Sequence, residues 1–199
     1  GQDFLFIADA GKQTAPGWSK DLKPLAASAS AENPAETAST TLGETAFYIY
    51  TSGTTGLPKA AVISNRRYLI SADMAGTGGL KCKTQDRIYL CLPLYHATGL
   101  LLGVGSALAT GASMFVRRKF SASNFLKEVR QHHCTHMIYI GERCRYLVNS
   151  EAQADDAKNP LRSIMGNGLR PDIWMQFKQR YGISRICEFY GASEGNVAF

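Results

Sequence analysis

The stretch of the chain with the densest set of chemically useful groups is residues 51–59. In order, it consists of Thr51, Ser52, Gly53, Thr54, Thr55, Gly56, Leu57, Pro58 and Lys59. Glycine lets backbone N–H groups approach a ligand closely and converge on anionic oxygens. Hydroxyl groups add hydrogen-bond donors, and lysine adds a mobile positive charge. The stretch predicts a loop that binds a polyphosphate, and the alternative is a glycine-rich hairpin without a ligand.

The segments on either side of this loop are typical of β-strands. Residues 46–50 are rich in aromatic and β-branched side chains, and residues 60–64 form a short apolar run. A Walker-type loop has the spacing G-x-x-x-x-G-K-[ST] and is followed by a helix, and the sequence here predicts neither feature. We therefore expect a phosphate loop that joins two strands.

Strand and helix patterns alternate over the rest of the chain. Strands are predicted for residues 87–92, 113–116, 136–140 and 185–190, and helices for residues 65–75, 100–110, 142–149 and segments beginning near Ser121 and Pro171. The predicted fold class is α/β, with a layered, largely parallel sheet and helices on both faces. Ligands of such sheets bind at the carboxyl ends of the strands. We therefore expect one crevice to collect the residues that follow strands, namely His96, Gly141, Gly166 and Glu194.

Charge and composition narrow the class of partner. The chain of 199 residues has 22 basic and 16 acidic residues, a net charge of +6. Its basic residues are scattered and no nucleic-acid-reading motif accompanies them, so we expect a small polyanion and no nucleic acid. Residues 20–45 are rich in Ala, Ser, Thr, Glu and Pro, which predicts a flexible loop. The sequence contains no apolar run of membrane-spanning length.

The cysteines and one histidine-rich run raise the question of disulfides or a metal site. The five cysteines are odd in number and form no C-x-x-C pair, which favours a reducing compartment, and we expect a cytoplasmic location. The run His132, His133, Cys134 and His136 lacks a second ligand pair, so metal binding there is the less favoured alternative.

Four segments of the sequence resemble the adenylate-forming superfamily, which includes acyl-CoA synthetases, luciferases and peptide-synthetase adenylation domains. They are the loop TSGTTGLPK, the Pro-x-aromatic-His turn at residues 93–96, the glycine loop at residues 166–171, and residues 188–196, which are similar to the Tyr-Gly-x-Thr-Glu motif. Residues 119–123, 139–142 and 188–196 are similar to the branch of very-long-chain acyl-CoA synthetases and fatty acid transport proteins. The resemblance runs from about residue 42 to residue 199.

The resemblance implies a reaction and a role for each motif. A fatty acid carboxylate would attack the α-phosphorus of ATP to give acyl-AMP and pyrophosphate, and CoA would then form the thioester. Residues 51–56 and Lys59 would hold the outer phosphates, Glu194 would bind Mg²⁺, and Ser193 would contact the α-phosphate beside Gly191 and Ala192. Tyr190 would stack on adenine next to Gly166, Asn167 and Gly168. His96 would gate the entrance for the acyl group or CoA.

Three of these roles have plainer alternatives. Tyr190 is also explained as a core aromatic at a strand end. Glu194 is also explained as a loop carboxylate that binds backbone, and His96 as a ring bonded to a neighbouring carbonyl.

The resemblance also sets expectations for the whole protein. Residues 1–199 are expected to be a fragment of an N-terminal adenylation domain, without the C-terminal domain that carries the catalytic lysine. Small side chains at Gly141 and Ala192 are expected to leave room for a long aliphatic chain. The rival functions are a transport protein whose main role is fatty acid uptake and a nucleotide-binding module without catalysis. Peripheral association with the inner face of the cell membrane is compatible with the resemblance, and the oligomeric state is not indicated.

Overall fold

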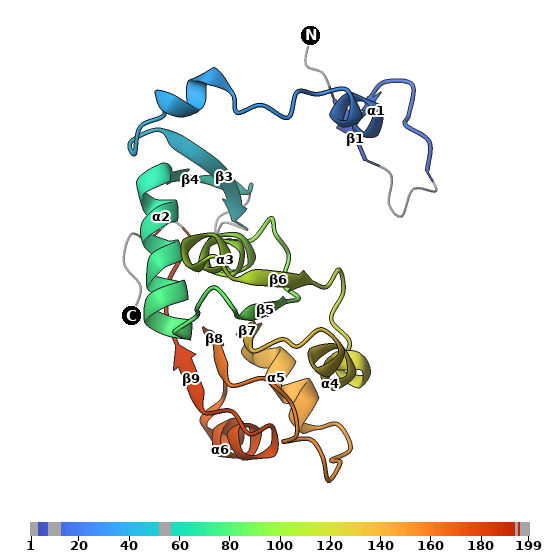
Figure 1. Ribbon diagram of the computed structural model, residues 1–199, viewed down its shortest axis with the longest axis vertical. Coiled ribbons are helices and arrows are strands. Elements are labelled where there is room, and N and C mark those ends of the chain that lie inside the picture. Colours follow the sequence, from blue (N-terminus) through green and yellow to red (C-terminus); the bar gives the residue numbers. More distant parts are fainter. Residues whose placement is uncertain (1–3, 8–12, 52–56, 194, 196–199) are drawn as a thin grey trace. The chain divides into compact units, whose positions relative to one another are not determined.

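The computed structural model describes the chain except for residues 1–3, 8–12, 52–56, 194 and 196–199 (Figure 1). The chain divides into two compact units, residues 1–40 and residues 41–199. The candidate site lies in the second unit, which also holds the main sheet.

The described residues of the first unit form two short strands and two short helices. Its strands β1 (Leu5–Phe6) and β2 (Lys20–Asp21) pair in parallel. Helix α1 (Leu22–Ala27) and the short 3-10 helix η2 (Ala35–Ala38) follow, and neither contains a buried residue. Both helices fall within residues 20–45, so the expectation of a loop is wrong for these two segments, while flexibility of the region stays a prediction.

The second unit begins with an antiparallel hairpin of β3 (Thr45–Thr51) and β4 (Lys59–Ser64). The predicted phosphate loop therefore joins two strands, as the sequence indicated. Ile49 and Ile63 are buried on one face of the hairpin and pack against Leu101. Because side chains alternate along a strand, the opposite face carries the exposed Tyr48 and Tyr50.

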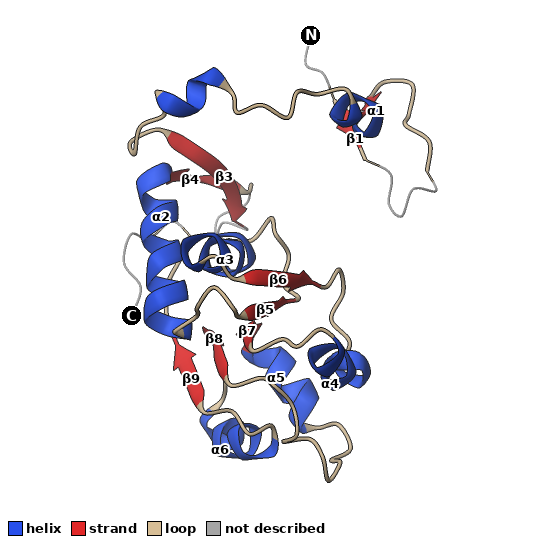
Figure 2. Cartoon of the chain, viewed as in Figure 1, coloured by secondary structure: helices blue, strands red, loops and turns tan. Residues whose placement is uncertain are grey.

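A five-stranded parallel sheet forms the centre of the second unit, with the order β6-β5-β7-β8-β9 (Figure 2). Its strands are β5 (Arg87–Leu90), β6 (Ser113–Val116), β7 (His136–Ile140), β8 (Ser163–Asn167) and β9 (Arg185–Glu188). The inner strands are covered on both faces, which explains their continuous apolar runs. Met137, Ile138 and Tyr139 of β7 are each fully buried.

Three α-helices cover one face of this sheet. They are α4 (Ala122–Gln131), α5 (Gly141–Val148) and α6 (Pro171–Arg180). Phe125 of α4, Cys144 of α5 and Phe177 of α6 pack into one buried cluster with aromatic side chains of the sheet. Helix α6 begins at Pro171, where the missing N–H costs nothing, as the sequence predicted.

The other face is covered by two helical segments that each contain a π-helix. Helix α2 (Asn65–Asp73) continues into η3 (Met74–Leu80), and η4 (Thr98–Val104) continues into α3 (Gly105–Thr110). The two segments approach so closely that a Cβ atom at Gly105 would lie 2.8 Å from the Cβ of Ala72. Helices therefore cover both faces, which confirms the predicted α/β class. The sequence predicted helices in these regions but not their π-helical turns.

Candidate functional site

A pocket of about 930 Å³ lies between α2–η3, the start of η4 and the carboxyl ends of β8 and β9. Its polar lining includes Arg66, Arg67, His96, Asn167, Glu188 and Ser193. Its apolar lining includes Ile70, Met74, Leu101, Leu102, Met165 and Phe189. The pocket thus offers positive charge and hydrogen-bond donors beside an aliphatic surface, at the edge where parallel sheets bind ligands.

The structure brings together some of the predicted site residues and not others. Those that line the pocket are His96, Asn167, Gly191, Ala192 and Ser193. Those that are described but do not line it are Thr51, Lys59, Gly166, Gly168 and Tyr190. Ser52, Gly53, Thr54, Thr55, Gly56 and Glu194 lie outside the described residues.

The two ends of the predicted phosphate loop face each other across the hairpin. Thr51 pairs with Lys59 in the β3–β4 register, and the Thr51 hydroxyl donates to the Lys59 carbonyl oxygen at 3.4 Å. The hairpin packs against Leu101, which also lines the pocket. The loop is therefore anchored on an element that forms the pocket wall, and its binding of phosphate stays a prediction.

His96 ends a tight turn at the entrance to η4. Its backbone N–H donates to the Pro93 carbonyl at 3.2 Å, and its ring Nδ1 accepts from the Thr98 N–H at 3.3 Å. A side chain at Gly99 is excluded because its Cβ would lie 2.3 Å from the Pro93 oxygen. Because Nδ1 is an acceptor, the neutral ring carries its proton on Nε2. The ring therefore accepts a bond from a backbone N–H, and both the gating role of His96 and the alternative of a bond to a carbonyl stay predictions.

The glycine loop at the end of β8 is shaped by close backbone contacts. A Cβ at Gly166 would lie 2.2 Å from the Tyr139 carbonyl oxygen, and a Cβ at Gly141 would lie 1.6 Å from the Gly168 oxygen. Gly168 itself has a φ of +77°, which a side chain disfavours. The small size of Gly141 is therefore needed for the glycine loop, and the expectation that it makes room for an acyl chain is wrong.

Glu188, at the end of β9, holds this glycine loop in place. Its carboxylate accepts from the backbone N–H groups of Gly168 at 3.0 Å and Leu169 at 2.9 Å, and from the Tyr139 hydroxyl at 2.5 Å. Tyr139 is fully buried, and burial together with the bond to Glu188 raises the pKa of its hydroxyl. The sequence placed both residues within recognised segments but gave no sign that they pair.

Arg67, in the first turn of α2, reaches the turn that follows β9. One of its terminal nitrogens donates to the carbonyl oxygens of Ser193 at 2.7 Å and Ala192 at 3.4 Å, and also to that of Gly195. The sequence analysis missed this residue, because only the fold brings it to a turn so distant in the chain.

Tyr190 follows the strand that Glu188 ends. Its side chain is 77% exposed, so the alternative of a core aromatic is wrong. Stacking on adenine stays a prediction.

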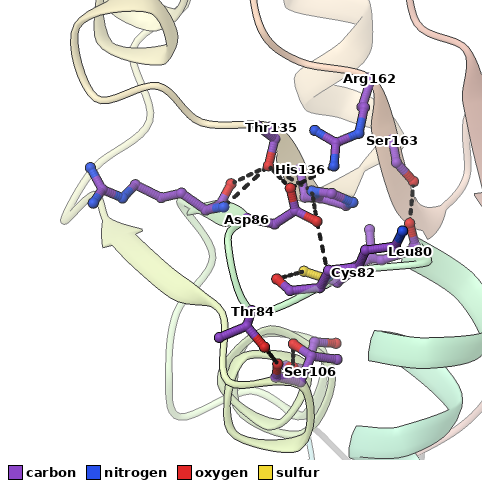
Figure 3. Close-up of polar contacts among 12 residues, drawn as sticks. Leu80, Cys82, Thr84, Asp86, Ser106, Thr135, His136, Arg162 and Ser163 are labelled. Carbon is purple, nitrogen blue, oxygen red and sulfur yellow. Dashed lines mark hydrogen bonds and ion pairs between the residues drawn. The ribbon is translucent and has the colours of Figure 1, made fainter.

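A second polar cluster lies at the opposite edge of the sheet (Figure 3). Cys82, Asp86 and His136 offer ligand atoms within 4.8 Å of one another, all in buried side chains. The Asp86 carboxylate, however, already accepts from the Arg162 guanidinium at 2.5 Å, from the Thr135 hydroxyl at 3.1 Å and from the Lys83 N–H at 2.9 Å. Because the Arg162 guanidinium already supplies the positive charge that a metal ion would bring to Asp86, we assign this cluster a structural role.

A parallel α/β sheet with such a pocket at its carboxyl edge is the arrangement of enzymes that bind nucleotides and small substrates. A sequence model of the AMP-binding enzyme family matches residues 7–199, and the chain belongs to this family.

Comparison with individual proteins places the chain within the fatty-acid branch. The medium/long-chain-fatty-acid–CoA ligase FadD6 of Mycobacterium tuberculosis is 47% identical over 90% of this chain and 30% of its own length. The human long-chain fatty acid transport protein 1 is 44% identical over 89% of this chain and 27% of its own length. A malonyl-CoA ligase in complex with methylmalonyl-CoA and AMP has a TM-score of 0.65 and 28% identity, covering 77% of this chain and 34% of that protein. The resemblance read from the sequence is confirmed.

Two further findings concern the extent of the chain and its helices. It spans about 30% of the length of the ligase relative. None of its described helices combines the length and the hydropathy that crossing a bilayer requires.

Proposed function

We propose that the protein containing this chain activates a long-chain or very-long-chain fatty acid with ATP and transfers the acyl group to CoA. The observation that carries the proposal is the mixed lining of the pocket. A polyphosphate needs positive charge and hydrogen-bond donors, which Arg67 and Ser193 bring to the pocket, and an alkyl chain needs an apolar wall such as that of Met74 and Met165.

The proposed reaction has two steps. A carboxylate oxygen of the fatty acid attacks the α-phosphorus of ATP, and pyrophosphate leaves. The CoA thiol then attacks the acyl carbonyl carbon, and AMP leaves. Because negative charge gathers on phosphate oxygens, the protein contributes mainly positioning and charge neutralisation.

The residues of this chain take the following parts. The Ser193 hydroxyl would donate to the α-phosphate, Lys59 and residues 51–56 would hold the outer phosphates, and Asn167 and Tyr190 would border the adenine. Mg²⁺, with Glu194 as its expected ligand, would neutralise charge on the phosphates when bound, and Glu194 lies outside the described residues. His96 would stand at the entrance used by the acyl group or CoA.

A screen of carboxylic acids tests the proposal. The full-length protein is assayed for pyrophosphate release and for acyl-CoA formation with long fatty acids, aryl acids and amino acids. We expect long fatty acids to rank first, and a clear preference for aromatic acids would contradict the assignment. Calorimetry with Lys59→Ala and Thr54→Ala should show weaker ATP binding, and unchanged affinity in both variants would remove the phosphate loop from the site.

Fatty acid uptake is the second candidate function, and the 44% identity to the human transport protein favours it. In this case esterification would trap the imported acid inside the cell. Uptake of a labelled fatty acid by cells that express either the unsubstituted protein or Lys59→Ala separates the two. Uptake that persists when ligase activity is lost would assign transport as an independent role.

A further inference from the structure

Three backbone carbonyl groups of the turn after β9 point toward a single side chain. The carbonyl oxygens of Ala192, Ser193 and Gly195 all accept from one terminal nitrogen of Arg67, at 2.7 Å for Ser193 and 3.4 Å for Ala192. The Arg67 side chain is only partly exposed and lines the pocket together with Ser193. The contact therefore lies inside the proposed site.

Converging carbonyl groups need a positive charge between them. Each carbonyl oxygen is the negative end of a dipole, so three of them directed at one point repel one another unless a cation occupies that point. A guanidinium keeps its charge at every physiological pH and carries several donors in a rigid plane. Hydrogen bonds from such a charged donor are stronger than neutral ones. Removal of this one side chain would leave the carbonyl groups of Ser193 and Gly195 without this charged donor, while the Ala192 carbonyl keeps its bond from the Gly195 N–H at 3.0 Å.

Arg67 is linked through β4 to the other half of the proposed phosphate site. It lies in the first turn of α2, three residues after the last residue of β4, and the first residue of β4 is Lys59. The backbone N–H of Arg67 donates to the hydroxyl of Ser64, which ends β4, at 3.3 Å. The backbone of Arg67 is thus fixed to the strand that ends the predicted phosphate loop. Its side chain is fixed to the turn that carries Ser193.

We propose that Arg67 is a positioning residue that fixes the Ser193 turn relative to the phosphate-loop hairpin. The inference rests on the proposed function, because only there do both elements contact one ATP molecule. Arg67 would act through backbone geometry and not through contact with the fatty acid. Its loss would therefore lower kcat while leaving the KM for the fatty acid nearly unchanged.

Kinetic measurements on the full-length protein test the predicted effect of Arg67 on kcat. Arg67→Met removes the charge and the donors at nearly constant length, and we expect kcat to fall on the order of tenfold to a hundredfold, as small misplacements in active sites do. Arg67→Lys restores a charge with three donors and should recover part of the loss. Arg66→Met removes the same charge from the neighbouring residue, which is exposed at the rim of the same pocket, and should lower kcat much less.

Amide hydrogen exchange tests the positioning without any catalytic assay. Exchange in a peptide covering residues 190–195 should be faster in Arg67→Met than in the unsubstituted protein and unchanged in Arg66→Met. Unchanged exchange in Arg67→Met, or equal losses of kcat in the Arg66 and Arg67 variants, would overturn the proposal. If the unsubstituted protein makes no acyl-CoA but Arg67→Met still speeds exchange, the proposed function fails and the role of Arg67 in holding the turn stands.

Discussion

The amino and carboxyl edges of the five-stranded sheet both carry clusters of charged side chains, but these side chains bind different partners. At the amino edge, Asp86 binds the side chains of Arg162 and Thr135 and lies beside His136, and it is only 1% exposed. At the carboxyl edge, Glu188 and Arg67 bind mainly backbone groups of turns. The side chains of the first cluster bind one another, whereas those of the second hold the backbone turns that border a pocket.

This difference shows why closeness of ligand atoms alone does not define a site. The amino edge brings cysteine, aspartate and histidine within coordination reach, yet the aspartate is already satisfied by donors of the protein. At the carboxyl edge the charged side chains fix the backbone and leave polar groups such as Asn167 and Ser193 facing an open volume. We infer that the amino edge supports stability and the carboxyl edge supports binding.

The largest expected effect comes from breaking the amino-edge cluster. Asp86→Ala would leave the Lys83 N–H and the Thr135 hydroxyl without their acceptor and Arg162 without its ion pair. We expect a loss of about 3 kcal/mol in the free energy of unfolding, because each part-buried donor left without its acceptor costs about 1–3 kcal/mol, whereas the half-exposed Arg162 is rehydrated. Urea unfolding of the full-length protein measures the loss.

A matched aspartate provides the control for this experiment. Asp155 pairs with Arg130 at 3.2 Å, but its side chain is 55% exposed, so Asp155→Ala should cost less than about 1 kcal/mol. Equal losses in the two variants would contradict a special role of the amino edge. ATP affinity of the folded Asp86→Ala protein should stay unchanged, because the cluster does not reach the pocket.

A substitution of Glu188 tests the proposed binding role of the carboxyl edge. Glu188→Gln keeps the shape but removes the charge that accepts from the Gly168 and Leu169 N–H groups and from Tyr139. We expect the KM for ATP to rise roughly tenfold, equivalent to about 1.4 kcal/mol, with a smaller change in the KM for the fatty acid. Glu142→Gln makes the same chemical change at an exposed residue that pairs with Arg145, and it should leave both constants unaltered. An equal rise in the KM for ATP in both variants would remove Glu188 from the site.

The sequence predicted the elements of the fold better than the contacts that complete the site. β6 and β7 have the predicted bounds, because short apolar runs between turn residues mark buried strands clearly. The π-helix η3 was missed, because its glycine-rich sequence has no clear helical period. Arg67 with Ser193 and Tyr139 with Glu188 are pairs that only the sheet order brings together, so no local pattern could indicate them.

The pH dependence of stability tests whether the buried side chains at the amino edge stabilise the fold. Burial lowers the pKa of His136, so the unfolded chain takes up a proton at higher pH than the folded protein does. Its contribution to stability is therefore full above about pH 6.5 and falls as the pH drops below that value. Burial raises the pKa of the Asp86 carboxyl, but the hydrogen bonds from Arg162 and the Lys83 N–H lower it by more, so the net pKa lies below its ordinary value. The contribution of Asp86 to the stability of the fold is therefore lost only below about pH 4.

Unfolding free energies measured between pH 7.5 and pH 5 test this assignment. We expect the free energy of unfolding to decrease over this range, with a slope of at most about 1.4 kcal/mol per pH unit for one proton. His136→Gln should flatten that slope, because it removes the titrating group while keeping a polar side chain. A slope that is the same in the variant would show that another residue binds the proton.

The smallest expected effect concerns the apolar wall of the pocket. Gly78 and Gly79 are neighbours in η3, and both line the pocket. A Cβ at Gly79 would lie 2.3 Å from the sulfur of Met165, which also lines the pocket, whereas a Cβ at Gly78 would meet nothing within 4 Å. Gly79→Ala therefore forces the flexible Met165 side chain to move, and Gly78→Ala does not. If the alkyl chain of the acid lies along this wall, Gly79→Ala should shift the ratio of kcat/KM for long against medium-length fatty acids by roughly a few-fold. This is less than the roughly tenfold or more that one carbon atom causes in a rigid apolar pocket, because the flexible Met165 side chain can move. Both variants exchange glycine for alanine in the same helix, so they share any gain in helix stability. A ratio that shifts equally in the two variants, or in neither, would place the alkyl chain elsewhere.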